Sequence, residues 1–346
     1  MYYHIVLVAA LTVCATLRAA ELPDLPDAVT NNAVAAIALG DGVHLISAMG
    51  LRAGKTWRDT SSAAWHLAPG ATQWRSLAAV PGGEGRLAST AVAVGKFIYL
   101  FGGYTVAEDH TEVSVPLVHA LDPVSGFYTQ RAAMPVPVDD TVALAYADRY
   151  IYLVSGWHDS GNVNLVQLYD TETDTWQQAT PWPAAAVFGH AGGIVGDVMI
   201  VCDGVKVQTT RSQRKFKAAK RCLQGKIRAD DYRRIDWSAV PHHPGQALYR
   251  MAATGAAIDN EPVIFFAGGS VNPYNYNGIG YDGKPSAASS ALFAWFVADQ
   301  RWRRLENLPV GTMDHRGLIQ YNDEFVIIGG MRDQQRVSSD VLQFRP

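Results

Sequence analysis

The sequence predicts an all-β protein folded as a propeller of about six blades, each with four strands. A unit of about 50 to 60 residues recurs along the chain, and repeats of this length are typical of propellers. Each unit contains a very apolar strand that ends in small residues, and three units carry a Trp near their last strand. The 31 glycines among 346 residues suit the many turns that such an architecture requires.

The composition agrees with one folded unit. Hydrophobic residues make up 48% of the chain and charged residues 18%, below the usual quarter, so extended disorder is not expected. The formal net charge of -3 provides no field that would attract nucleic acid or an acidic membrane. We therefore expect no nucleic-acid partner and no stable membrane contact, and the oligomeric state stays open.

Residues 1–20 have the pattern of a secretory signal peptide. Residues 2–20 form one apolar run centred on 5–13, and small residues precede the polar stretch that begins at Glu21. The run is short for a membrane span, which makes an uncleaved anchor the less favoured alternative. We expect a periplasmic or secreted protein whose single propeller domain covers residues 21–346.

Two cysteines, Cys202 and Cys222, remain after the signal peptide. Disulfides persist in exported proteins, and the intervening segment has the pattern of one hairpin. Either the two residues are joined or they are separate buried thiols, and the sequence leaves both possibilities open.

The third unit shows the pattern of a blade best. Strands are expected at Thr141–Tyr146, Tyr150–Val154 and Val166–Asp170, followed by an outer strand reaching Trp176. Further copies of the apolar second strand are expected at 43–50, 97–103, 198–204, 263–269 and 325–330. Paired glycines end several of these strands because backbones crowd near the axis, where a residue without Cβ permits close approach and positive φ.

The chain ends are expected to close the ring. The last unit supplies only a third strand, at 341–344, and Glu21–Asp27 contains Leu-Pro pairs like those that end other units. This N-terminal segment would complete the last blade and cover two exposed edges. The repeated Gly-Gly and the block Tyr169–Trp176 resemble the kelch-repeat family over nearly all of the mature chain. The resemblance implies a six-bladed kelch-type β-propeller.

Polar residues precede the inner strand of every unit, and these positions form a ring around the axis of a propeller. They are Asn31, Asn32, Arg86, Asp139, Asp140, His190, Tyr249, Arg250, His315 and Arg316. Loops after the second strands add Arg52, Tyr104, Trp157, His158, Asp203, Lys206, Tyr274, Tyr276 and Arg332. Arginine binds carboxylates through two N–H groups, and aromatic faces suit sugars. A small anionic or polyhydroxylated ligand is expected there; the alternative is a solvated rim without a ligand.

The fifth and sixth units carry a narrower resemblance. Four segments resemble the bacterial periplasmic N-acetylneuraminate mutarotases: Phe266–Gly269, the loop Asn272–Gly278, Tyr281–Gly283 and a strand ending near Trp302. The resemblance implies a cofactor-free isomerase that exchanges the anomers of a sialic-acid-like sugar acid by acid–base catalysis. The candidate substrate-binding residues are Arg86, Asp140, Lys206, Arg250, Arg316, Tyr276 and His315.

The sequence offers two candidates for the acid–base residue. The glutamate position of that family falls on Gly204, whereas Lys206 matches in register. Asp203, one residue away, and His190 are the catalytic candidates, since an unperturbed His titrates near neutral pH. A kelch propeller that only binds a glycan or a protein partner is the alternative function.

No metal ion is expected. His242 and His243 are adjacent, but neighbouring histidines in an extended segment point apart. A basic run, which comprises Arg211, Arg214, Lys215, Lys217, Lys220 and Arg221, is expected to form a solvated surface hairpin.

Overall fold

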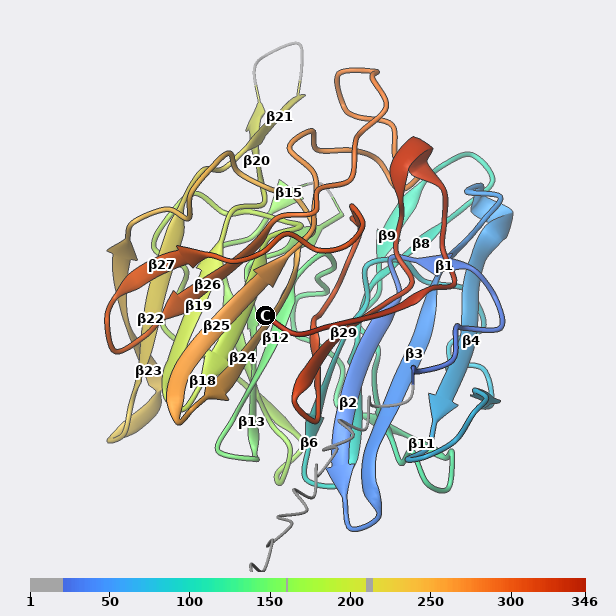
Figure 1. The fold of residues 1–346 in the computed structure, drawn as a ribbon, viewed down its shortest axis with the longest axis horizontal. Coiled ribbons are helices and arrows are strands. Elements are labelled where there is room, and N and C mark those ends of the chain that lie inside the picture. The colour runs from blue at the N-terminus through green and yellow to red at the C-terminus, as the bar shows by residue number, and fades with distance from the viewer. Residues whose placement is uncertain (1–20, 160, 210–213) are drawn as a thin grey trace, which may run out of the picture.

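The computed structural model describes residues 21–159, 161–209 and 214–346, and the expected signal peptide lies outside these residues. Within the described chain, six antiparallel sheets surround a central axis and form the blades of a propeller (Figure 1). Helical structure in the same residues is confined to two 3₁₀ turns, η1 (Trp57–Asp59) and η2 (Asp333–Gln335). None of the described helices is long and apolar enough to cross a membrane.

Each blade is a meander that runs outward from the axis, and the blades are numbered 1 to 6 in the order of the chain. The inner strands are β2 (Ala33–Leu39), β6 (Thr90–Val94), β12 (Val142–Tyr146), β18 (Ala191–Val195), β24 (Ala252–Ile258) and β28 (Ile319–Tyr321). The second strands are β3 (Gly42–Arg52), β7 (Phe97–Phe101), β13 (Tyr150–Val154), β19 (Val198–Cys202), β25 (Glu261–Ala267) and β29 (Glu324–Ile328). All six second strands were predicted.

The outer half of each blade completes this pattern. The third strands are β4 (Thr60–Leu67), β10 (Val118–Leu121), β16 (Val166–Asp170), β22 (Cys222–Arg228), β26 (Leu292–Phe296) and β30 (Val341–Phe344). The outermost strands are β5 (Arg75–Ser76), β11 (Tyr128–Arg131), β17 (Thr175–Gln178), β23 (Asp231–Val240) and β27 (Arg301–Arg304). The short β1 (Val29–Thr30) pairs with the end of β3.

The paired glycines adopt the expected conformation. Gly268 and Gly269 follow β25 with φ of 71° and 88°, in the left-handed region. A Cβ on Gly268 would lie 2.5 Å from the carbonyl oxygen of Thr312 in the next blade. Glycine is therefore required here both by the backbone conformation and by the close approach of neighbouring blades.

The N-terminal segment closes the ring as predicted, although it does not form a regular strand. Leu25 N donates to Ser339 O over 2.9 Å, and Val341 N donates to Asp24 Oδ1 over 3.0 Å. Pro23 and Pro26 lack the N–H group that a continuous ladder needs, so residues 21–28 lie beside β30 without strand pairing.

Recurring tryptophans bridge neighbouring blades. Trp176 Nε1 donates to Ala132 O, which follows the outer strand of blade 2, and Trp302 Nε1 donates to Pro241 O, which follows that of blade 4. Trp74 Nε1 donates to Pro23 O in the same way, over 2.8 Å. The closing segment thus occupies, for the last blade, the place that an outer strand end occupies in the others.

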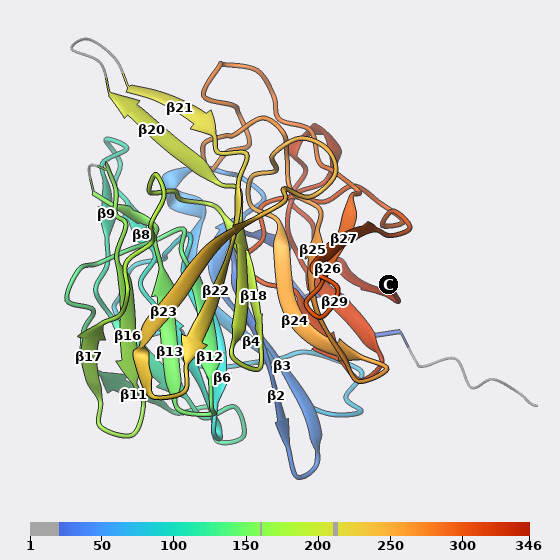
Figure 2. The ribbon, with the colours of Figure 1, turned by 90° about the vertical axis from the view of Figure 1, so that its left-hand side faces the viewer.

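Three hairpins and one long loop extend from the same face of the propeller (Figure 2). The hairpins are β8 (Tyr104–Val106) with β9 (Glu112–Ser114), β14 (Trp157–His158) with β15 (Gly161–Asn162), and β20 (Val205–Thr209) with β21 (Arg214–Ala218). The loop joins β25 to β26. A disulfide joins Cys202 and Cys222, which are cross-strand partners in β19 and β22, and so answers the question that the sequence left open.

Candidate functional site

In each blade, one of the residues shortly before the inner strand has a left-handed backbone. These residues are Asn31, Ala88, Asp140, Gly189, Arg250 and Asp314. Hydrogen bonds link them around the axis: Asp140 N donates to Ala88 O, Gly189 N to Asp140 O, and Arg250 N to Gly189 O, over 2.8–3.2 Å. Positive φ is costly for residues other than glycine, and it persists where the surrounding structure imposes it. The ring ties the six blades together.

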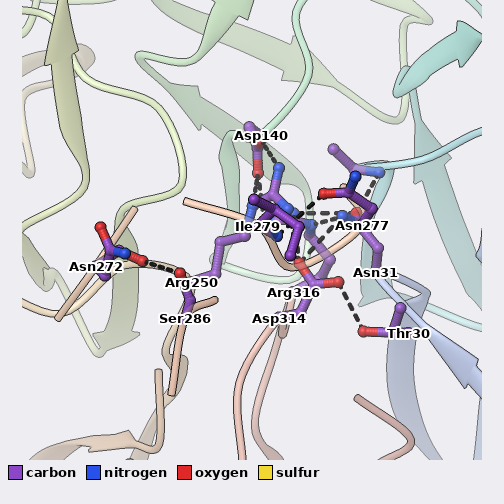
Figure 3. A network of polar contacts seen from close by, with 11 residues as sticks. Thr30, Asn31, Asp140, Arg250, Asn272, Asn277, Ile279, Ser286, Asp314 and Arg316 are labelled. Atoms are coloured by element: carbon purple, nitrogen blue, oxygen red, sulfur yellow. Dashed lines mark hydrogen bonds and ion pairs between the residues drawn. The ribbon is translucent and has the colours of Figure 1, made fainter. Parts of the chain in front are cut away.

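Three charged side chains of this ring, Asp140, Arg250 and Asp314, form a buried network with Arg316, which lies two residues after Asp314 (Figure 3). Arg250 pairs with Asp140 through two nitrogens and with Asp314 over 2.7 Å. Arg316 pairs with Asp140 and donates to Asn31 Oδ1 over 3.0 Å. Since two carboxylates face two guanidinium groups, the network is neutral overall. Two of the three arginines predicted to hold a carboxylate, Arg250 and Arg316, therefore already have acidic partners.

A pocket lies beside this network, on the face from which the three hairpins and the long loop extend, and is called the loop-face pocket. Its cavity measures about 90 Å³. It is lined by Tyr104, Glu112, Asp139, Asp140, Trp157, Phe188, Phe216, Arg250, Asn275, Tyr276 and Tyr281. The hairpins of blades 2, 3 and 4 and the loop between β25 and β26 all contribute, so the pocket depends on four separate parts of the chain.

Two carboxyl groups of the loop-face pocket have raised pKa values, and the shift is the larger for Asp139. Asp139 is buried, and its desolvation together with the neighbouring Asp140 raises its pKa well above the ordinary value. Its Oδ2 lies 2.7 Å from Ser114 Oγ. Glu112 is on the exposed β9 strand at the mouth, where partial desolvation raises its pKa as well. Carboxyl groups in different environments can divide the roles of acid and base.

Aromatic side chains form the walls of the pocket. Phe216 stacks on Tyr281 with ring centroids 4.0 Å apart, and Trp157 lies edge-on to Phe188 at 5.3 Å. Tyr249 packs edge-on to Phe188 at 5.7 Å, and Gly189 leaves room for the Tyr249 ring, because a Cβ there would lie 1.9 Å from it. Flat apolar walls beside hydrogen-bonding groups suit the C–H faces and hydroxyls of a sugar.

The sequence-predicted residues do not all reach this pocket. Asp140, Arg250 and Tyr276 line it. His190 and His315 instead line a separate axial channel of about 270 Å³ between the inner strands, together with Arg316. Burial lowers the pKa of His190 to about 4 and that of His315 to about 3, so both imidazoles are neutral near pH 7.

Arg86 and Lys206 lie away from the pocket lining. Arg86 is two residues before the ring position of its blade, Ala88, and donates to the carbonyl oxygens of Gly102 and Pro81. Lys206 lies on β20 opposite Lys217 of β21. The basic run therefore forms a surface hairpin, as expected, over its described part.

Asp203 also does not line the loop-face pocket, and its carboxylate contacts two histidines. His242 Nε2 lies 2.6 Å from Asp203 Oδ1, and His243 Nε2 lies 2.7 Å from Oδ2. Burial opposes ionisation of Asp203, but its contacts with the two imidazoles outweigh this effect and lower its pKa. The two histidines were expected to point apart, but both face Asp203, because residues 241–243 do not form a strand.

Three polar groups of the site region were not predicted from the sequence: Glu112, Tyr281 as a pocket residue, and Asp314. Asp314 immediately precedes the predicted His315–Arg316 pair, so a ring position read one residue earlier would have included it. Glu112 comes from a hairpin with no motif of its own, and only the fold carries it to the pocket.

Comparisons with known proteins agree on the fold. No protein-family model matches the chain. Kelch domain-containing protein 3 from Homo sapiens and from Rattus norvegicus is 24% identical over 284 residues, which cover 77% of this chain and 69% of that protein. Kelch-like protein terF of Aspergillus terreus is 29% identical over 182 residues, 52% of this chain and 36% of that protein. The solved structure of YjhT superposes with a TM-score of 0.72 at 16% identity, over 94% of this chain and 97% of that one.

Proposed function

Because this chain is a six-bladed β-propeller of the kelch type, ligand binding is expected where its loops converge, and we propose that the protein is a cofactor-free mutarotase or epimerase. Its substrate is a sialic-acid-like sugar acid. The supporting observation is that two carboxyl groups with raised pKa, Glu112 and Asp139, line one aromatic-walled pocket with Arg250. The proposal includes export to the periplasm or beyond, from the pattern of residues 1–20.

The proposed reaction needs only proton transfers. Glu112, at the mouth, removes the proton of the anomeric hydroxyl while protonated Asp139 donates a proton to the ring oxygen, and the ring C–O bond breaks. Rotation of the open-chain carbonyl and attack on its other face reform the ring. The protons then return, so no electron or group is gained or lost.

Arg250 supplies the contact to the sugar carboxylate. A guanidinium has five N–H groups, and three of those of Arg250 bind Asp140 and Asp314, which leaves two for a ligand. Because the network is neutral, Arg250 holds the sugar carboxylate through a directional pair of hydrogen bonds. The network offers the carboxylate no net positive charge. Asp140 and Asp314 hold the guanidinium in place for it.

A propeller that binds a glycan without turning it over is the second candidate. Two observations favour it: the arginines already have acidic partners, and a cavity of 90 Å³ is small beside the several hundred Å³ of usual ligand sites. Only one end of a sugar acid would then enter the pocket.

Proton NMR of freshly released α-N-acetylneuraminate separates the two candidates. At a pH where spontaneous anomer exchange is slow, we expect the protein to accelerate formation of the β anomer. Glu112→Gln should reduce this acceleration by about 100-fold or more, as expected for loss of a general base. Glu108→Gln is the matched control, since Glu108 lies on the same hairpin but is exposed outside the pocket lining.

Each outcome decides between the candidates. Acceleration that Glu112→Gln removes and Glu108→Gln retains supports the mutarotase. Line broadening of the sugar without acceleration supports the binding propeller. If millimolar sugar shows neither acceleration nor line broadening, both assignments of ligand class are contradicted.

A further inference from the structure

A polar cluster outside the loop-face pocket joins blades 4 and 5. Asp203 follows β19, whereas His242 and His243 lie in the connection from β23 to β24. Their two Nε2 atoms each face a different oxygen of the Asp203 carboxylate, at 2.6 and 2.7 Å. One ligand-type atom from each residue lies within 4.8 Å of the others. The chain thus brings two imidazoles and one carboxylate to a single point.

Backbone carbonyls determine where the imidazole protons lie. His242 Nδ1 is 2.7 Å from the carbonyl oxygen of His243, and His243 Nδ1 is 3.3 Å from that of Pro244. A carbonyl oxygen can only accept a hydrogen bond, so each Nδ1 carries a hydrogen. In a neutral imidazole the lone pair is then on Nε2. In this tautomer both Nε2 lone pairs face the Asp203 carboxylate, an arrangement that a cation bound between them stabilises.

One shared cation suits this arrangement better than two additional protons. Two imidazolium rings would repel each other at a centroid distance of 4.0 Å. The side chains of Asp203 and His243 have no exposed surface, so water would not screen that repulsion. A single ion bound by both Nε2 atoms and the carboxylate leaves the two rings neutral.

We propose that Asp203, His242 and His243 bind a divalent transition-metal ion, with Zn²⁺ as the first candidate. Two histidines and one carboxylate are a ligand set that zinc and non-haem iron both use. Metal-binding histidines commonly donate their other ring N–H to a carbonyl, as both of these do. The His242 side chain is 13% exposed, so solvent can supply the remaining ligand on that side.

The surroundings hold the three residues in place. Leu248 N donates to Asp203 Oδ2 over 2.8 Å, and His243 stacks on Phe293 with centroids 4.5 Å apart. Ligand atoms around a tetrahedral zinc are separated by about 3.3 Å, so the imidazoles and the carboxylate need to move apart by about 0.6 Å. The partly exposed His242 can supply most of this movement.

A second His–Asp cluster provides the matched control. His44 lies 2.9 Å from both His66 and Asp41, and Arg75 donates to His66 Nδ1 over 3.0 Å. Every hydrogen bond in this second cluster can form with neutral imidazoles, because each ring has one donor and one acceptor partner. The same residue types therefore need no shared cation here, and His66→Gln should leave metal binding unchanged.

The test is a zinc titration of the untagged full-length protein after chelator treatment, against a chromogenic competitor. We expect one Zn²⁺ per chain, at least tenfold weaker binding in His242→Gln, and unchanged binding in His66→Gln. Asp203→Asn should abolish binding; if it fails to fold, His242→Gln carries the test, with circular dichroism to confirm its fold. Visible absorption of bound Co²⁺ should report the ligands and disappear in His242→Gln.

The proposal is overturned if the wild-type protein takes up no stoichiometric zinc, or if His242→Gln binds it as tightly as the wild type. It does not depend on the mutarotase proposal, because the metal readouts involve no sugar and the three residues are outside the lining of the loop-face pocket.

Discussion

Asp139 and Asp140 are neighbours in the chain, yet their environments drive their protonation in opposite directions. Burial opposes ionisation of Asp140, but Arg250 and Arg316 outweigh it and lower its pKa. Asp139 is buried without such a partner, so desolvation raises its pKa. These adjacent residues, of which Asp140 has a left-handed backbone, thus favour opposite states: an anion in the network and a neutral acid in the pocket.

This difference predicts the pH dependence of stability. A carboxyl whose pKa is raised on folding binds more protons in the folded state, so its stabilising contribution is complete below about 3.8 and is lost as pH rises through the raised value. Asp139→Asn mimics the neutral acid. As the pH rises from 4 to 9, we expect the free energy of unfolding to fall less in this variant than in the wild type. Urea unfolding across this pH range measures the difference. Curves that stay parallel over this range would show that Asp139 is ionised.

At the scale of the element, the β20–β21 hairpin covers one side of the loop-face pocket. Cross-strand partners share a face, and successive residues alternate. Phe216, opposite Val207, therefore faces the pocket and Tyr281, whereas Lys215, opposite Gln208, faces the other way. One short hairpin presents an aromatic wall inward and a basic surface outward.

Phe216→Ala is expected to weaken binding of N-acetylneuraminate without altering the propeller. Loss of one aromatic contact is worth about 0.5–1.5 kcal/mol, or about 2- to 12-fold in Kd. The measurement is a titration followed by NMR of the sugar. Lys215→Ala on the opposite face is the control and should bind as the wild type does. Equal weakening in both variants would place the ligand outside the aromatic wall.

At the scale of the whole molecule, the ring of blades is closed by chain ends more than 300 residues apart in sequence. Trp74 and Ser339 both bond to this N-terminal segment, and Leu25 is buried against the last blade. Without it, β30 would become an exposed edge, and such edges promote association between chains.

Removal of residues 21–27 should therefore destabilise the protein. Burial of Leu25 alone contributes about 2 kcal/mol, so a chain beginning at Ala28 should unfold at lower temperature than one beginning at Glu21. Light scattering should also detect dimers or larger species of the shorter chain. Identical melting and size for the two chains would show that the closing segment is not needed.

The sequence by itself determined the blades of this protein, because strands and turns are set by local patterns. Alternating apolar runs, the Gly-Gly pairs and the Trp–Pro spacing were enough to predict all six second strands and the role of the N-terminal segment. The irregular form of that segment follows from its two prolines. The polar ring residues Asp140 and Arg250 were predicted for the same reason, since they hold fixed positions in the repeat.

Only the tertiary structure decided the partners of those residues. Arg250 pairs with Asp140 from 110 positions away and with Asp314 from 64, so its charge is already neutralised in a way that no local pattern reveals. Glu112 reaches the pocket, and both histidines turn to Asp203, through packing between separate blades. Repeats encode the frame of the propeller, whereas the charge balance of its sites depends on contacts across the closed ring.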